Sequence, residues 1–124
     1  MNHPKQPAQK FPRSSRLLKH ADFQALYKQG KKYFSGNMTA FYRSRNDQGS
    51  PRVGFTVGKV LGGAVERNRI RRRMRAAVRL KLFQLAAPLD IALHPRKSVL
   101  TLDFERLGQE VEQVFAAVQK GKTR

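Results

Sequence analysis

Apolar residues recur at helical spacing in three segments of the chain, at about residues 22–30, 64–85 and 103–121. The apolar positions that share one side of each predicted helix are Phe23, Leu26 and Tyr27, then Ile70, Met74, Ala77 and Val78, then Leu107, Val111, Val114, Phe115 and Val118. Residues typical of helix starts and ends flank the first and last segments, namely Asp22, Gly30, Asp103 and Gly121. The sequence therefore predicts three amphipathic helices.

Strands are predicted between the helices. Residues 31–45 and 51–58 are rich in aromatic and β-branched side chains, and residues 46–50 between them have the composition of a polar turn. Apolar residues alternate with polar or small ones from Val53 to Val57, which gives that strand one apolar face. Residues 89–93 form a further predicted strand, which lies between two prolines that limit its length.

The order helix, strands, helix, strand, helix predicts an α+β sandwich in which one small sheet is covered by helices. A chain of 124 residues fits a single domain. We expect that domain at residues 17–121, after a flexible basic tail at residues 1–16 and before a disordered end at residues 122–124. If the strands on either side of the second helix are parallel, local rules predict a right-handed crossover through it.

The chain is strongly basic, with 26 Lys and Arg against 8 Asp and Glu and a net charge of +18. An excess of this size favours a polyanion and predicts a nucleic-acid partner. Because there is no cysteine, disulfides and thiolate metal sites are excluded, and a reducing cytoplasm suits the chain. No apolar run approaches the roughly 20 residues that cross a bilayer, and the N-terminus lacks the apolar stretch of a signal peptide. We expect a cytoplasmic protein with no membrane partner.

Seven arginines lie between Arg67 and Arg79, on the second predicted helix. The side of that helix opposite its apolar residues carries Asn68, Arg72, Arg75 and Arg79. Guanidinium groups on a packed helix offer bidentate donors to phosphate oxygens at fixed spacing. A solvated charged face is the simpler alternative. Over residues 59–81, however, nine basic residues stand against one acid, and such self-repulsion favours a bound polyanion.

Three blocks of the chain carry a resemblance to a known family: residues 22–30 (DFQALYKQG), residues 52–59 (RVGFTVGK) and residues 64–75 (AVERNRIRRRMR). In this order they resemble the first helix, a strand and the arginine-rich helix of the protein subunit of bacterial ribonuclease P. The resemblance covers about residues 16–118. The Arg-Asn-Arg triplet alone is a weak signal, but the three blocks in register are specific.

This resemblance implies an α-β-β-β-α-β-α fold with a four-stranded sheet. It also implies a left-handed β-α-β crossover through the arginine-rich helix, which we adopt against the local rule. The expected partners are a catalytic RNA and the precursor tRNA from which that RNA removes the 5′ leader, with no obligate protein partner. Hydrolysis then belongs to the RNA and requires magnesium, while the protein alone binds no cofactor.

The resemblance also assigns residues to two surfaces. The residues expected to contact the catalytic RNA are Lys59, Arg67, Asn68, Arg69, Arg71, Arg72 and Arg75. Those expected to bind the leader, in a cleft between the first helix and the sheet, are Phe23, Tyr27, Phe41, Lys28 and Arg43. Aromatic faces in such a cleft can stack on unpaired bases without reading their identity.

A few positions near the arginine-rich helix depart from the family pattern. Val60 stands where a second lysine is frequent, Gly63 where a polar side chain is frequent, and Ala76 where an acid is frequent. Glu66 places an acid directly before the Arg-Asn-Arg triplet. We expect these departures to change the detail of RNA docking at the start of the helix.

Several of the assigned residues also fit a purely structural role. Phe23 and Tyr27, four residues apart on a helix, suit the core of a small domain. For the strand that contains Phe41, alternation leaves open whether the odd-numbered or the even-numbered residues face the core. Lys59 and Arg52 fit ordinary solvated charges.

We expect no catalytic residue and no metal site in the protein itself. His3, His20 and His94 stand far apart and in no metal-ligand spacing. The acids toward the C-terminus are Asp103, Glu105, Glu110 and Glu112. They are typical of a solvated helix start rather than of a two-metal nuclease centre. Two other interpretations stay open, a structural ribosomal protein and an autonomous nuclease.

Overall fold

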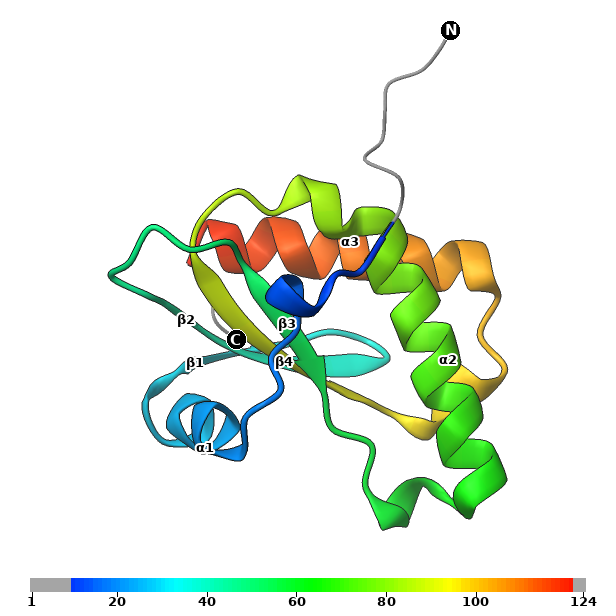
Figure 1. Ribbon diagram of the computed structural model, residues 1–124. Helices are drawn as coiled ribbons and strands as arrows, with labels where there is room; N and C mark the ends of the chain where they lie inside the picture. Colours follow the sequence, from blue (N-terminus) through cyan, green and yellow to red (C-terminus); the bar gives the residue numbers. More distant parts are fainter. Residues whose placement is uncertain (1–9, 122–124) are drawn as a thin grey trace, which may run out of the picture.

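The computed structural model describes residues 10–121, which form a four-stranded sheet and three α-helices (Figure 1). The elements are α1 (His20–Gln29), β1 (Lys31–Phe34), β2 (Met38–Ser44), β3 (Arg52–Phe55), α2 (Ala64–Lys81), β4 (Leu89–Pro95) and α3 (Phe104–Gln119). The predicted α+β class and the α-β-β-β-α-β-α order are confirmed. The aromatic segment at residues 31–45 contributes two strands, because the chain turns between Phe34 and Met38.

The strands follow the order β1-β2-β4-β3 across the sheet. β2 pairs antiparallel with both β1 and β4, whereas β3 and β4 are parallel neighbours. The link between β3 and β4 runs through α2, so this helix forms the crossover of a β-α-β unit. The left hand expected for this crossover stays a prediction. β3 lies at the edge of the sheet. On its outer side it pairs with the segment before α1 through one isolated bridge, Arg16↔Val53.

The two faces of the sheet carry different helices. α2 and α3 cover one face over the main core, and α1 covers the other (Figure 1). In β2 the even-numbered residues Met38, Ala40 and Tyr42 belong to the main core, while Phe41 packs beneath α1. Alternation could not identify one buried face of β2 because helices cover both faces. The even-numbered residues face the main core, and Phe41 faces α1.

The apolar sides predicted for the second and third helices are buried. Ile70, Met74, Ala77 and Val78 of α2 are fully buried, and the five apolar positions of α3 are at most 1% exposed. At the start of α3, the carboxylate of Asp103 accepts a hydrogen bond from the backbone N–H of Arg106 at 3.3 Å, as predicted for an N-cap. Helical periodicity thus identified the core residues of both long helices.

The expected solvated role is wrong for one acid of α3. Glu110 is only 9% exposed and accepts hydrogen bonds from the hydroxyl of Ser35 and from the backbone and side-chain amides of Asn37, all within 2.7 Å. It therefore ties α3 to the turn between β1 and β2. Three hydrogen bonds compensate for removing this carboxylate from water.

The folded part begins before residue 17. Phe11, which we assigned to the tail, is 7% exposed and belongs to the main core, and a 3-10 turn follows at Arg13–Ser15. The expected tail boundary is wrong for residues 11–16 because this segment packs over the edge of β3. The rest of the expected tail, residues 1–9, and the expected disordered end, residues 122–124, lie outside the described residues.

Candidate nucleic-acid interface

Two glycines and an acid set the start of α2. Gly62 has φ +134°, a conformation that favours glycine, and Gly63 precedes the first helical residue. The carboxylate of Glu66 accepts a hydrogen bond from the backbone N–H of Gly63 at 2.9 Å. This acid, a departure from the family pattern, therefore caps the helix from which the arginines project.

Six of the seven arginines of α2 fall into two groups. Arg69, Arg72, Arg75 and Arg79 are exposed and make no hydrogen bond or ion pair with any described residue. The guanidinium of Arg73 instead donates to the backbone carbonyls of Val99 and Leu102, and that of Arg67 donates to the carbonyl of Gly62 at 3.1 Å. The arginines of the first group have hydrogen-bond donors available to a ligand, and those of the second group hold the helix in place.

The remaining residues assigned to the catalytic RNA lie on or next to the same helix face. Asn68 is exposed and accepts a hydrogen bond from Arg71 at 2.9 Å. Lys59 is exposed in the 3-10 turn Lys59–Leu61 that leads into the helix. Among the described residues, no arginine of α2 takes part in an ion pair. The helix thus presents positive charge that no nearby acid neutralises.

The three aromatic residues assigned to the leader lie together between α1 and the sheet. Phe23, Tyr27 and Phe41 are half-buried and pack against Leu26 of α1 and Ala92 of β4. The ring centres of Phe23 and Tyr27 are 6.3 Å apart, and those of Tyr27 and Phe41 are 5.1 Å apart. We call this group the aromatic cleft. Its residues pack against apolar neighbours and remain partly exposed, which is compatible with leader binding and with a core role.

Gly30 brings α1 close to the sheet. It is the C-cap residue predicted from sequence, but its φ of −81° requires no glycine. What requires glycine is space, since a Cβ at Gly30 would lie 2.7 Å from the carbonyl oxygen of Leu26 and 2.8 Å from that of Tyr42. The missing side chain lets the end of α1 rest on the backbone of β2.

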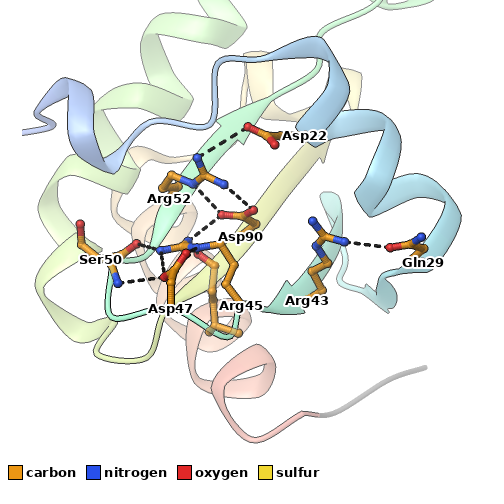
Figure 2. Close-up of polar contacts among 10 residues, drawn as sticks. Asp22, Gln29, Arg43, Arg45, Asp47, Ser50, Arg52 and Asp90 are labelled. Atoms are coloured by element: carbon orange, nitrogen blue, oxygen red, sulfur yellow. Dashed lines mark hydrogen bonds and ion pairs between the residues drawn. The ribbon is translucent and has the colours of Figure 1, made fainter.

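Two basic residues assigned to the leader lie on α1 and β2. Lys28 is exposed on α1, and Arg43 on β2 donates to the side-chain oxygen of Gln29 at 2.9 Å (Figure 2). A further cation is Lys32, whose ammonium lies 5.2 Å from the centre of the Phe41 ring. Sequence reasoning missed Lys32 because its position depends on the pairing of Lys32 with Phe41 across β1 and β2.

His94 is a second member of the cleft that sequence reasoning missed. Its Nε2 lies 2.9 Å from the hydroxyl oxygen of Tyr27, which in turn lies 2.8 Å from the hydroxyl of Thr56. The imidazole also packs 4.8 Å from the ring centre of Phe41. Burial lowers the pKa of His94 below its ordinary value of 6.5. Alternation along β4 could have predicted this position, because His94 lies two residues after Ala92 and therefore on the same face, toward α1.

Another group of arginines is bound to a buried carboxylate. Asp90 on β4 is fully buried and accepts hydrogen bonds from Arg52 at 2.7 and 2.8 Å and from Arg45 at 2.8 Å (Figure 2). Arg52 also lies 3.6 Å from the carboxylate of Asp22 on α1. The hydrogen bond from Arg52 to Asp90 raises the pKa of Arg52 above its ordinary value. The solvated role considered for Arg52 is therefore wrong.

Comparison with known proteins shows the family of the chain. The family described as Ribonuclease P matches residues 11–119 of the chain. The chain belongs to the bacterial ribonuclease P protein family. It is 36% identical over 96 residues to the ribonuclease P protein component of Finegoldia magna, a match that covers 77% of this chain and 82% of that protein. The component of Desulforapulum autotrophicum is 37% identical over 112 residues, covering 87% and 92%.

Solved structures of ribonuclease P proteins share the fold. The Staphylococcus aureus RNase P protein superposes with a TM-score of 0.70 at 27% identity, covering 86% of this chain and 97% of that one. The Thermotoga maritima RNase P protein gives a TM-score of 0.71 at 24% identity, covering 81% and 94%. Among the residues described in our structure, no helix is long and apolar enough to cross a membrane, and no group of three His, Asp or Glu is placed to hold a metal ion.

Proposed function

We propose that the chain is the RNA-binding subunit of ribonuclease P, which assists a catalytic RNA in removing the 5′ leader from precursor tRNA. The observation that carries this proposal is the pair of surfaces on one small domain, exposed arginines on α2 and a half-buried aromatic cleft beneath α1. The first offers donors for phosphates, and the second offers ring faces for unpaired bases.

The roles of the two surfaces follow from their chemistry. Lys59, Arg69, Arg72 and Arg75 dock the catalytic RNA through its phosphates, because they are exposed and uncompensated among the described residues. The aromatic cleft holds the leader, which is single-stranded and therefore able to stack on Phe23, Tyr27 and Phe41. Hydrolysis, with its magnesium requirement, is assigned to the RNA, and the protein contributes position and affinity.

The test is cleavage of precursor tRNA by the catalytic RNA at low magnesium concentration, with and without the protein. We expect the protein to raise the cleavage rate and to increase affinity for precursor tRNA over mature tRNA. Protein without RNA should cut neither substrate, and tagged protein should recover one discrete RNA from cells. The absence of any protein-dependent gain, or recovery of the protein with ribosomal subunits instead, would contradict the proposal.

A further inference from the structure

A pocket of about 280 Å³ lies at the edge of β3, between the segment before α1 and the helix α2. It is lined chiefly by three phenylalanines and three arginines: Phe11, Phe23, Phe55, Arg16, Arg71 and Arg75. No acid is found among its described lining residues. The pocket touches both surfaces of the proposed function but lies between them.

The aromatic wall of the pocket is held in place by the protein itself. The ring centres of Phe11 and Phe55 are 6.1 Å apart, with the rings inclined at 59°. The guanidinium of Arg16 lies 5.5 Å from the centre of the Phe11 ring, and its Nε donates to the carbonyl of Phe11 at 2.9 Å. The terminal nitrogens of Arg16 make no hydrogen bond with a described residue, so they remain available to a ligand.

Arg75 brings a second uncompensated cation from the opposite side. It is exposed on α2 and has no hydrogen bond or ion pair with a described residue. Arg71 beside it is already bonded to the side chain of Asn68. The guanidinium groups of Arg16 and Arg75 therefore line one pocket from two different segments, and no acid lies among the described lining residues. Such an arrangement favours binding of a phosphate group.

Gly54 joins this pocket to the aromatic cleft. A Cβ at Gly54 would lie 2.6 Å from Cζ of Phe23 and 2.7 Å from the carbonyl oxygen of Leu17. The tip of the Phe23 ring therefore rests on the bare backbone of β3, so that Phe23 belongs to the cleft and to the pocket lining at once. A strand of bases lying in the cleft can continue past Phe23 toward Arg75.

We propose that this pocket binds one unpaired nucleotide of the 5′ leader, with its base against the half-buried ring of Phe55 and its phosphate at Arg16 and Arg75. Arg75 then lies between the leader and the catalytic RNA, and its five N–H donors can serve both. The proposal rests on the proposed function. The volume suits one flat base and is below that of typical pockets for larger ligands, which begin at about 300 Å³. The leader is chosen as the source because Phe23 is shared with the cleft assigned to it.

The first test uses the holoenzyme assembled with its catalytic RNA and compares dissociation constants for precursor and mature tRNA. Phe55→Leu should weaken precursor binding by roughly fivefold or more, the loss typical of one base stack. Arg16→Gln should weaken it by a similar factor through the loss of a charge-assisted contact to phosphate. Both variants should leave mature tRNA binding within about twofold. The matched controls Arg13→Gln and Phe83→Leu change exposed residues outside the pocket and should leave both constants unchanged.

The second test places the fluorescent base 2-aminopurine at single leader positions. We expect quenching by stacking at one position in the wild-type complex, and its relief in Phe55→Leu. Equal losses for precursor and mature tRNA would overturn the proposal in favour of a nucleotide of the catalytic RNA. Unchanged binding and quenching in both variants would overturn it in favour of an empty pocket.

The two proposals fail in different ways. If the wild-type holoenzyme does not prefer precursor over mature tRNA, the proposed function fails. If the wild type shows this preference and the pocket variants keep it in full, only the pocket assignment fails. Unfolding midpoints of the variants within a few degrees of wild type would show that a loss of binding is not a loss of folding.

Discussion

The arginines of α2 and those around Asp90 are the same residue type in opposite situations. Arg45 and Arg52 converge on one fully buried carboxylate, whereas Arg72 and Arg75 project from a helix with no described partner. A strongly basic chain thus uses part of its positive charge to hold its own sheet together and leaves another part uncompensated. Net charge alone does not separate the two uses, but the position of the few acids does.

The largest effect should follow from removing the buried carboxylate. Asp90→Asn leaves Arg45 and Arg52 without their counter-charge, and breaking a buried pair in this way costs about 3 to 5 kcal/mol of unfolding free energy. Urea unfolding followed by circular dichroism measures it. Asp47→Asn, at an exposed carboxylate bound to Arg45, is the matched control and should change stability little. Similar stability of both variants would show that Asp90 does not organise this group.

The converse is expected for the exposed arginines. Arg72→Ala combined with Arg75→Ala should leave the unfolding free energy nearly unchanged and weaken binding of the catalytic RNA. Each lost phosphate contact removes roughly 0.7 to 0.9 from the slope of log affinity against log salt. Lys97→Ala combined with Arg106→Ala removes the same charge from exposed sites outside α2. A salt slope that falls equally in both double variants would indicate general attraction without docking on α2.

The aromatic cleft lies between these extremes, because its residues are packed and yet partly open. Phe23→Ala should weaken binding of precursor tRNA by about 1 to 3 kcal/mol, the range for one base stacked on one ring, with a smaller loss for mature tRNA. Equilibrium binding to the holoenzyme measures both. An equal loss for the two RNAs, accompanied by a lower unfolding midpoint, would assign Phe23 to the core alone.

The smallest effect concerns His94. Because burial lowers its pKa in the folded state, the unfolded chain binds the proton more readily. The stability that neutral His94 supports is present above about pH 6.5 and is lost as pH falls below it. His94→Gln should flatten this part of the pH profile of unfolding, whereas His20→Gln, at an exposed histidine, should not. Identical profiles for wild type and His94→Gln would contradict the assignment.

Local periodicity was sufficient to predict α2 and α3. The apolar spacing identified Ile70, Met74 and Val78 as core, and the opposite side was left to exposed residues such as Arg72 and Arg75. The fold class followed from the order of the elements. These features depend on neighbours within one or two helical turns, and such neighbours can be read along the chain.

What the sequence did not predict depends on contacts between distant segments. Asp90 stands in an apolar strand, and its partner Arg52 is 38 residues away, so nothing nearby indicated a buried ion pair. Likewise Glu110 meets Asn37 across 73 residues, and His94 meets Tyr27 across 67. Each contact follows from the register of the sheet and from which helix covers which face, and neither is encoded locally.

Arg73 has a consequence for how quickly an RNA is captured. Two of its five N–H donors are bonded to the carbonyls of Val99 and Leu102, yet those carbonyls carry no formal charge, so its positive charge stays uncancelled. It therefore strengthens the electrostatic field around α2 and speeds diffusional encounter, while its two hydrogen bonds hold the guanidinium against the protein. A guanidinium that fixes α2 to the rest of the protein thus also contributes to the long-range attraction of RNA.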